Sequence, residues 1–505
     1  MKLLNVFSWS VGLTVLITTS ASAATLIYTN DVLGDIEPCG CRSNPQGGMV
    51  RKSQLVERLA DKSILQVDAG DLLFDTDVLP DALQKQAEIQ AGFLLKSMDL
   101  LHHDAAVPGE KDFALGVKVF QKLISKSQIH FLAANIRSHG KELLKAHQIF
   151  VLKDPSGKKI RVAVFGVVGE KLHWPSELKV TSAIDAAKKE VATLKKSSDL
   201  IIAISHQGYD EDSAMAAAVP GIDMIVGGHS QSFLQTPIKV GSTTIYQSSF
   251  RNQYIGVQPL KVPFTSDGHA LIGLDISYEP GADSKLGAEM KSLVVNFKAS
   301  VADFNSKQTA SIVRVPSTGG DLTVHYQTFP KCAECHMKQY DFWRKTPHAN
   351  ALAPLVQSKQ LRNLDCIRCH SVGLGEKNGY AGVNDISDPL SLEDLAQYLS
   401  AAHQAKSLKD EIKLTPKSEN VSLKNSLSGI HTSFAPVQCE NCHGAGGDHP
   451  FQGAIAKNPP DATCIKCHTP ERAPSWYTGE KKLDTENLLK KRLLISCPAG
   501  EMDPE

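Results

Sequence analysis

Residues 332–336 read Cys-Ala-Glu-Cys-His, and the same Cys-x-x-Cys-His pattern returns at 366–370, 439–443 and 464–468. This spacing is the attachment signature of c-type haem. Thiols one helical turn apart reach both vinyl groups of one haem, and the adjacent imidazole then meets the iron. We therefore predict four covalent haem c groups, held by the following residues: Cys332, Cys335, His336, Cys366, Cys369, His370, Cys439, Cys442, His443, Cys464, Cys467 and His468.

Zinc and disulfides are the alternatives for these cysteines. Cys-x-x-Cys pairs could build four-thiolate zinc knuckles, but zinc gives no reason for a His directly after every second Cys. Disulfides would likewise leave the motif histidines unexplained. Haem attachment accounts for all the fixed positions of the repeated motif.

A haem iron has a second axial position, so four haems require up to four distal ligands. We predict His348 and His449 as distal ligands, with His325 and His431 as further candidates. His449 follows His443 in a Gly-rich turn that could fold back to a neighbouring haem. His403 lies instead in an expected amphipathic helix from Ser391 to about Ser407, with a capping box at its start.

Longer strings around the motifs carry a family resemblance. They read CAECHMKQYDFWRKTPHA (332–349), CIRCHSVG (366–373), VQCENCHGAGGDH (437–449) and CIKCHTPERAP (464–474). They resemble the tetrahaem cytochrome c family typified by the electron carrier of ammonia oxidation, over about residues 325–480. The resemblance implies a mostly helical domain wrapped around closely packed haems that conducts electrons. That family can leave one haem without a distal ligand.

The composition is that of a globular chain without excess charge. Of 505 residues 42% are hydrophobic, and 54 Lys+Arg balance 54 Asp+Glu. A chain with no net positive charge does not attract the negatively charged backbone of nucleic acid. We therefore expect no nucleic acid partner, and instead redox partner proteins such as other cytochromes or a quinol-linked donor.

The N-terminus predicts export. Lys2 precedes an apolar run from Leu3 to about Ile17, and small residues follow up to Ala23. The pattern is that of a signal peptide (residues 1–23) cleaved after Ala23. A retained membrane anchor is the alternative, but polar residues dilute the run. No later stretch is apolar enough to span a bilayer, so we expect a periplasmic, secreted or cell-surface protein in an oxidising compartment.

Residues 24–300 alternate between short β-rich runs and amphipathic helical periods. The expected strands are Thr25–Asn30, Ile64–Val67, Phe131–Asn135, Arg161–Val168, Leu200–Ser205 and Met224–Val226, and the expected helices include Val50–Leu59, Ala82–Met98 and Ala183–Lys196. The alternation predicts an α/β layered domain with polar residues at the strand ends. A linker (301–330), a mostly helical haem domain (331–480) and a tail (481–505) with a helical period then follow.

The polar blocks at these strand ends carry a second resemblance. They read Thr29-Asn30-Asp31, Asp68-Ala69-Gly70-Asp71, Pro108-Gly109-Glu110-Lys111-Asp112, Ser205-His206-Gln207-Gly208 and Gly227-Gly228-His229-Ser230-Gln231. In order and spacing they resemble the metallophosphoesterase domain of secreted 5′-nucleotidases, where such blocks bind metal ions that polarise a phosphate ester. The resemblance makes Asp31 a first-metal ligand, Asp71 the bridging carboxylate, and His206 and His229 imidazole ligands.

Three positions depart from that family's pattern. Leu33 lies where the family has a ligand His, Glu110-Lys111 replaces Asn-His, and Gln231 replaces the last His. Lys111 thus takes the place of the His that stabilises the transition state, and Glu110 becomes a candidate metal ligand. The nucleotide-recognising domain of 5′-nucleotidases is replaced by the cytochrome region. We therefore expect the phosphoesterase fold to be retained and its divalent-metal site to be altered.

Another thiol pair lies close to Asp31 in the sequence, in Glu37-Pro38-Cys39-Gly40-Cys41, followed by Gly47-Gly48. Cys39 and Cys41 could form a thiolate-containing metal site, a reducible disulfide, or a loop disulfide without function. This string resembles a degenerate 5′-nucleotidase-like group that is often linked to redox proteins. Cys497 remains unassigned.

Three hypotheses of function follow. The first is an exported tetrahaem cytochrome that relays electrons, with the α/β domain as a docking, metal-binding or redox-sensing module. The second is a metal-dependent phosphohydrolase whose haem domain localises or regulates it. The third is a multihaem oxidoreductase acting on a small nitrogen or sulfur compound at an open haem or at Cys39 and Cys41.

Overall fold

The computed structural model describes residues 24–38, 45–59, 63–154, 157–308, 326–376, 378–388, 390–406, 430, 432–449, 455–470, 472–478 and 482–498. Several predictions lie outside these residues: the signal peptide (1–23), Cys39, Cys41, His325, His431 and the turn-rich part of the linker. Among the described residues, no helix is both long enough and apolar enough to cross a membrane.

The N-terminal part is built on two large sheets. The first contains, in spatial order, β15 (Ala270–Gly273), β14 (Tyr254–Pro259), β1 (Thr25–Thr29), β2 (Ile64–Asp68), β3 (Ala105–Ala106) and β4 (His130–Phe131). The second contains β12 (Ile238–Val240), β13 (Thr243–Tyr246), β11 (Met224–Gly227), β10 (Leu200–His206), β8 (Lys159–Val168) and β7 (His147–Lys153). A small third sheet contains β6 (Lys141–Glu142), β5 (Ile136–Ser138) and β9 (Leu178–Val180).

Strand alternation places the sheets in layers. On β8, Val162 and Val164 join the core between the two large sheets, whereas Ala163 and Phe165 join a separate cluster under α4 (Ala183–Leu194) and α5 (Tyr209–Ala218). A strand buried on both faces has side chains that alternate in this way. On the first sheet, Ile27 packs in the same manner under α1 (Met49–Arg58). The predicted α/β layered fold is confirmed.

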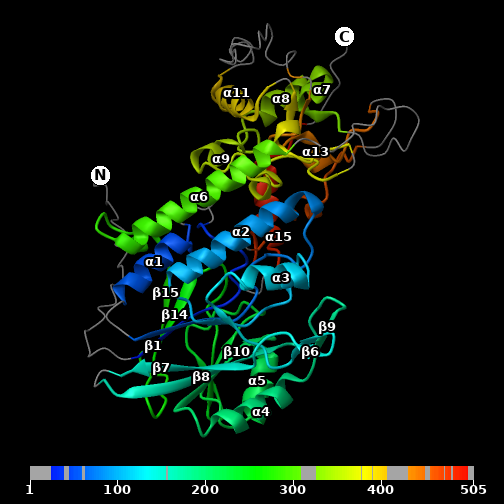
Figure 1. Cartoon of the computed structure of the whole chain (residues 1–505). Coiled ribbons are helices and arrows are strands. Elements are labelled where there is room, and N and C mark those ends of the chain that lie inside the picture. Colours follow the sequence, from blue (N-terminus) through cyan, green and yellow to red (C-terminus); the bar gives the residue numbers. More distant parts are fainter. Residues whose placement is uncertain are drawn as a thin grey trace, which may run out of the picture.

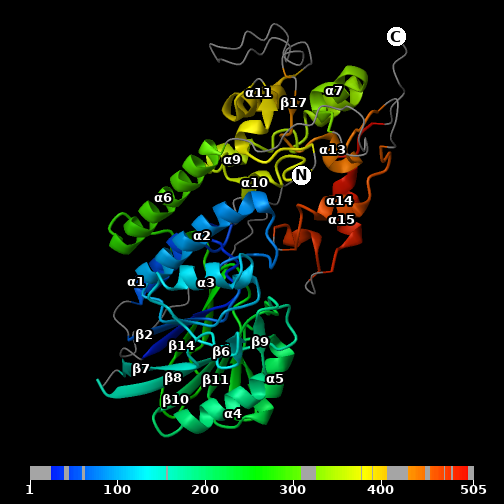
Figure 2. The same ribbon diagram turned by 45° about the vertical axis from the view of Figure 1, so that its right-hand side comes forward.

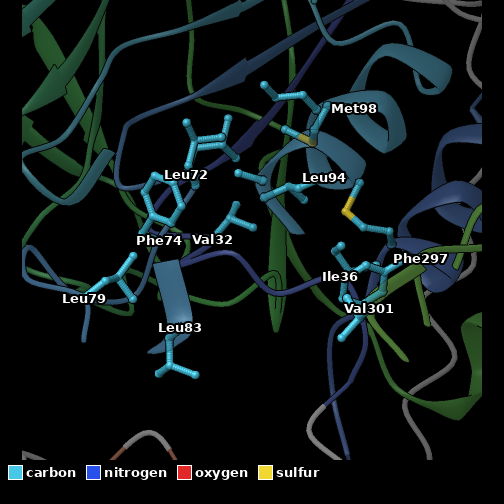
Figure 3. Close-up of a cluster of buried hydrophobic side chains, with 14 of the residues drawn as sticks. Val32, Ile36, Leu72, Phe74, Leu79, Leu83, Leu94, Met98, Phe297 and Val301 are labelled. Atoms are coloured by element: carbon cyan, nitrogen blue, oxygen red, sulfur yellow. The ribbon is translucent and has the colours of Figure 1, made fainter. Parts of the chain in front are cut away.

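Two long helices, α2 (Asp81–Leu100) and α6 (Lys285–Lys307), run side by side from the sheets toward the C-terminal region (Figures 1 and 2). Figure 3 shows side chains from both helices, among them Leu94, Met98, Phe297 and Val301, in one apolar cluster. α6 continues to Lys307, past residue 300, where we expected the linker to begin. α3 (Val117–Ile124) lies next to α2.

The C-terminal region is mostly helical, and its helices are short. They are α7 (Thr328–Cys335), α8 (Met337–Trp343), α9 (Ala353–Gln357), α10 (Leu364–Ile367), α11 (Leu392–Gln404), α13 (Cys439–His443), α14 (Asp461–Ile465) and α15 (Thr485–Leu493), with a pair of two-residue strands, β16 (Ser387–Asp388) and β17 (Thr432–Ser433). Short 3₁₀ turns complete both regions: η1 (Lys111–Phe113), η2 (Ile276–Tyr278), η3 (Val383–Asp385) and η4 (Pro474–Trp476). Phe329, Trp343 and Leu395 belong to the same apolar cluster as Leu72 and Val164, so one core continues through both regions.

The expected strand Phe131–Asn135 is only partly correct. β4 ends at Phe131, and the Asn135 side chain then donates to the carbonyl oxygens of Val168 (2.8 Å) and Thr181 (2.7 Å). The Asn135 side chain also accepts from the Val168 amide. Beyond Phe131 the backbone changes partners, since the Leu132 N–H donates to Ala106, the Ala133 N–H to Lys145 and the Ala134 N–H to Gly166 on β8.

One buried side chain joins the two regions. The amide oxygen of Gln86, on α2, accepts from Asn305 of α6 (2.7 Å) and from the backbone N–H of Leu364 (2.9 Å), the first residue of α10. Its Nε2 donates to Asn363, the N-cap of α10, at 2.5 Å. The helix that carries Cys366 is therefore fixed to both long helices.

Candidate metal centre and haem sites

The polar blocks meet at the carboxyl ends of neighbouring parallel strands. Asp31 follows β1, Asp71 follows β2, His206 ends β10 and His229 follows β11. Parallel strands open their carboxyl ends toward a common crevice. Five non-glycine residues here have left-handed backbone, which is costly for residues other than Gly and is found at functional sites. They are Asp31 (φ 50°), Leu33 (56°), Asp71 (51°), His229 (70°) and Gln231 (52°).

Four of the side chains in these blocks form a candidate metal centre: Asp71, Glu110, His206 and His229. Their ligand atoms all lie within 4.8 Å of one another. His206 Nε2 lies 3.1 Å from Glu110 and 3.5 Å from Asp71, while its Nδ1 is bonded to the carbonyl oxygen of Ala69 (2.7 Å). That carbonyl fixes the ring with Nε2 toward the centre. Two carboxylates and two imidazoles fit zinc or manganese.

Asp31 lies beside this group but is not part of it. Its Oδ2 accepts from the Asn30 side chain (2.8 Å) and from the His229 backbone N–H (3.1 Å). Its Oδ1 is buried and has no hydrogen-bond donor among the described residues. Burial raises the pKa of Asp31 to about 6. The ligand role of Asp31 thus stays a prediction, and Glu110 occupies the group instead.

Lys111 places a positive charge inside the centre. Its ammonium group is paired with the Asp71 carboxylate and lies 3.4 Å from Glu110. Burial opposes the charge, but Asp71 and Glu110 outweigh it and raise the pKa of Lys111 above its ordinary value. A lysine cannot act as the proton-shuttling His of a phosphoesterase does, because its ammonium stays charged at neutral pH.

The structure brings the four Cys-x-x-Cys-His motifs together in pairs. Cys332 lies near enough to Cys439 to raise the pKa of its thiol, and Cys369 does the same to Cys467. α13 and α14, which carry the third and fourth motifs, also contact each other. Haems attached at these positions would lie close enough together to exchange electrons.

Two of the four motif imidazoles, those of His370 and His443, have the orientation that haem ligation needs. Nδ1 of His370 bonds to the carbonyl oxygen of Ala351 (2.5 Å), and Nδ1 of His443 to that of Ala456 (2.7 Å). A carbonyl acceptor at Nδ1 leaves Nε2 as the nitrogen for iron. The ring of His468 stacks on Trp476 at 4.2 Å between centroids. The donor sets therefore fit covalent haem.

Both expected distal histidines lie beside a motif histidine. The ring centroids of His449 and His336 are 6.0 Å apart, and those of His348 and His468 are 6.2 Å apart. His403 lies on α11 with Nδ1 bonded to the Arg344 carbonyl oxygen (3.1 Å), and the expected cap of this helix is present, since Ser391 accepts from the Asp394 N–H. The ligand roles of His348 and His449 stay predictions that this arrangement favours.

One cavity of about 730 Å³ connects the two regions. Its wall contains Leu33, Lys111 and Gln231, which are positions that depart from the phosphoesterase pattern. Its opposite wall includes Cys369, Cys442 and Cys467. The altered side of the metal centre therefore faces the haem motifs.

Sequence reasoning missed the charged residues between these walls. Asp75 and Arg251 line the cavity from loops far apart in the chain, and Arg368 lines it from within the second motif. Arg251 follows β13 without any recognisable motif, so no sequence signal pointed to it. Arg472 also lines the cavity, and it lies in the string after the fourth motif.

Comparisons with known proteins match the α/β region and the helical region to different proteins. Residues 331–389 match the family model described as cytochrome c554 and c-prime. The 5′-nucleotidase of Homo sapiens is 30% identical over 229 residues, which are 42% of this chain and 38% of that enzyme. The 5′-nucleotidase of Mus musculus is 33% identical over 237 residues, 43% of this chain and 39% of the enzyme. The chain thus spans well under half the length of these curated relatives.

Solved structures of similar fold were also found. The calcineurin-like phosphoesterase YfkN from Bacillus subtilis gives a TM-score of 0.44 at 18% identity, covering 55% of this chain and 98% of that one. The 5′-nucleotidase precursor from Thermus thermophilus gives a TM-score of 0.46 at 19% identity, covering 66% and 68%. From the sequence matches and the observed layers, the chain joins an α/β region similar to 5′-nucleotidases to a helical region that matches a cytochrome c family.

Proposed function

We propose that this chain is an exported tetrahaem c-type cytochrome that relays electrons, and that its phosphoesterase-like domain serves it as a metal-binding module. The observation that carries the proposal is the set of four Cys-x-x-Cys-His motifs, which lie close to one another in the fold. Haem supplies one-electron chemistry when it is bound. The chain's own residues hold the macrocycles, fix their order and exclude water.

The expected axial ligands favour electron transfer through the haems over substrate binding at the iron. An iron with a histidine on each face transfers electrons without binding a substrate. His348 and His449 lie beside motif histidines and can supply the second ligand to two irons. The proposed partners are redox proteins of the periplasm or cell surface, such as other cytochromes or a quinol-linked donor.

Haem counting tests this proposal. The full-length protein, expressed in a host that attaches haem c, should give four haems per chain in a pyridine haemochrome assay. The double variant C366S/C369S should give three, whereas C497S should still give four, because Cys497 belongs to no motif. A count of zero or one in the wild-type protein would refute the proposal.

A second function, metal-dependent phosphate-ester hydrolysis, is favoured by one specific observation, the group formed by Asp71, Glu110, His206 and His229. If it operates, the holoprotein supplied with manganese or zinc should hydrolyse nucleotides or a model phosphodiester, and H206N should not. The ammonium of Lys111 beside Asp71 argues for a slow reaction. No turnover with either metal would exclude this function.

Spin-state spectroscopy separates the relay from an oxidoreductase acting on a small nitrogen or sulfur compound. Such an enzyme needs an open iron or a redox-active metal at Cys39 and Cys41. A high-spin haem signal in the wild-type holoprotein would indicate the open iron. Uniformly low-spin haems without a second redox metal would exclude the oxidoreductase and agree with the relay.

A further inference from the structure

The cavity between the two regions is bounded by a network of ion pairs, which we call the Asp75 cluster. Its members are Asp35, Asp75, Arg251, Asp365, Arg368 and Arg472. Arg251 pairs with Asp35 at 2.6 Å and with Asp75 at 3.7 Å. From the other side of the cavity, Arg368 reaches Asp75 at 3.2 Å and Asp365 at 2.8 Å. Asp75 is thus contacted by arginines of both regions.

The cluster lies next to a haem attachment sulfur. Nη1 of Arg472 lies 3.9 Å from Sγ of Cys369, and Nη2 of the same side chain lies 4.0 Å from Asp75 and 3.8 Å from Asp365. Cys369 lines the same cavity as Arg251, Arg368 and Arg472. A haem bound to Cys366 and Cys369 therefore has to enter the space that this cluster borders.

Most of the charged groups around the cavity are already paired, but two arginine donors lack an acceptor among the described residues. Lys111 is paired with Asp71 and Glu110, Arg251 with Asp35 and Asp75, and both Arg368 and Arg472 with Asp75 and Asp365. By contrast, Nε of Arg251 and Nε of Arg368 are buried without an acceptor in the part of the chain that the structure describes. Buried guanidinium donors need acceptors, and carboxylates are the strongest ones.

We propose that Arg251, Arg368 and Arg472 bind the propionate carboxylates of the haem attached to Cys366 and Cys369. The phosphoesterase-like region thereby supplies one wall of that haem pocket. The buried Nε–H groups of Arg251 and Arg368 thereby gain acceptors. This inference rests on the proposed cytochrome function, since it needs haem at the second motif. It makes Arg251 a positioning residue that acts across the two regions.

The test is a spectroelectrochemical titration of the full-length holoprotein. R251M removes a positive charge near one haem, so the reduction potential of that haem should fall. We expect a change of about tenfold in the reduction equilibrium constant, which corresponds to about 59 mV for one electron. D75N removes a negative charge from the same cluster, so the same haem should shift upward. A loosened pocket that admits water would stabilise the oxidised haem and lower its potential in both variants. Shifts of opposite sign in R251M and D75N would therefore show that charge, and not disruption of the pocket, changes the potential.

R161M is the matched control, because Arg161 is half-exposed, is paired with Asp199 at 3.0 Å and does not line the cavity. It should leave every potential unchanged. If R251M and D75N each keep four haems and wild-type potentials, the propionate assignment is wrong while the cytochrome proposal stands. A haem count below two in the wild-type protein would instead remove the proposed function itself.

A free oxyanion is the other source of an acceptor for these arginines. Inorganic phosphate and sulfate are therefore added to the wild-type holoprotein while the haem spectrum and potentials are followed. We expect no saturable change, because the propionates already occupy the guanidinium groups. A saturable shift in the haem spectrum or potential that R251M abolishes would overturn the propionate assignment. It would show that the Asp75 cluster binds a soluble anion instead.

Discussion

Gly48 lies against the ring of Pro38 at the entrance of α1. Its φ is +92°, and a Cβ atom there would lie 2.5 Å from Cδ of Pro38. Gly116, at the entrance of α3, has a similar φ of +85° and no atom within 4 Å of the corresponding Cβ position. The two N-cap glycines thus share a backbone conformation, but only Gly48 has a close neighbour. Comparing alanine substitutions at the two positions therefore distinguishes backbone strain from steric overlap.

We therefore expect Gly48→Ala to cost about 1–3 kcal/mol more in the free energy of unfolding than Gly116→Ala. Both variants lose the same glycine conformation, but only the first pushes the Pro38 ring away from α1. Chemical denaturation followed by circular dichroism checks this. Equal losses in the two variants would mean that the Pro38 contact contributes nothing.

His269 gives the fold a dependence on pH. It is hydrogen-bonded to the Tyr28 hydroxyl (2.8 Å), and burial lowers the pKa of His269 from the ordinary 6.5 to about 4. The unfolded chain takes up this proton near pH 6.5 and the folded chain only near pH 4. Stability from this residue is thus complete above pH 6.5 and is lost as the pH falls toward 4.

His269→Gln should flatten that part of the pH–stability profile by about 1–2 kcal/mol, a figure reduced for the partial exposure of the ring. Urea unfolding at several pH values between 4 and 7 measures it. His173→Gln is the control, because the His173 side chain is 83% exposed. A variant profile that remains parallel to the wild type would contradict the assignment.

At the scale of elements, α2, α6 and α10 depend on one another through Gln86. Gln86→Leu would remove the described acceptor of the Leu364 N–H, and the Asn305 side-chain amide and the Asn363 side-chain oxygen would each lose one of two hydrogen bonds. Unsatisfied buried groups cost about 1–3 kcal/mol each when relaxation is limited. We expect a loss of about 3 kcal/mol in all, with earlier release of the second haem site than of the sheets.

Gln84→Leu is the matched control for this experiment. Gln84 lies on the same helix, and its side chain bonds only to nearby residues, Leu79 and Asp81, in the part of the chain that is described. Denaturation followed both by the haem Soret band and by far-ultraviolet circular dichroism distinguishes the regions. A Gln86 variant as stable as the Gln84 variant would show that the link is not structural.

The elements with a strong sequence period were predictable, and the contacts between distant loops were not. β10 and β11 are buried along their whole length and β8 from Val162 onward, so they read as nearly uninterrupted apolar runs. β14 pairs antiparallel with β1 from the far end of the domain, and no local pattern marks that pairing. The predicted strand Phe131–Asn135 was only partly correct, because the backbone beyond Phe131 bonds to Lys145 and Gly166 from other parts of the chain. The Asp75 cluster was not predictable, since its members meet only after both regions fold.

At the scale of the whole molecule, Lys111 connects the candidate metal centre with the cavity that the second Cys-x-x-Cys-His motif lines. Lys111 lines the cavity and is paired with Asp71 of the candidate metal centre. Manganese or zinc added to the holoprotein should therefore raise the potential of the haem at the second motif, because nearby positive charge favours the reduced form. The measurement is a redox titration with and without metal.

H206N is the comparison for that titration, since it removes a buried ligand of the candidate centre. Its potentials should not respond to metal, and its affinity for manganese, measured by calorimetry, should fall at least about tenfold. H173N, altered at an exposed histidine, should behave as the wild type. A metal response that survives H206N would place the ion elsewhere.

The continuous core also has a consequence for biosynthesis. Cys369 lines a cavity whose walls come from both regions, and Phe329, Trp343 and Leu395 share one apolar cluster with Leu72 and Val164. Because a haem on this thiol would occupy that cavity, we expect haem attachment to precede docking of the two regions. We expect cofactor loading to be a checkpoint in maturation: a chain that closes early would be trapped without its second haem, and a loaded chain would close around it.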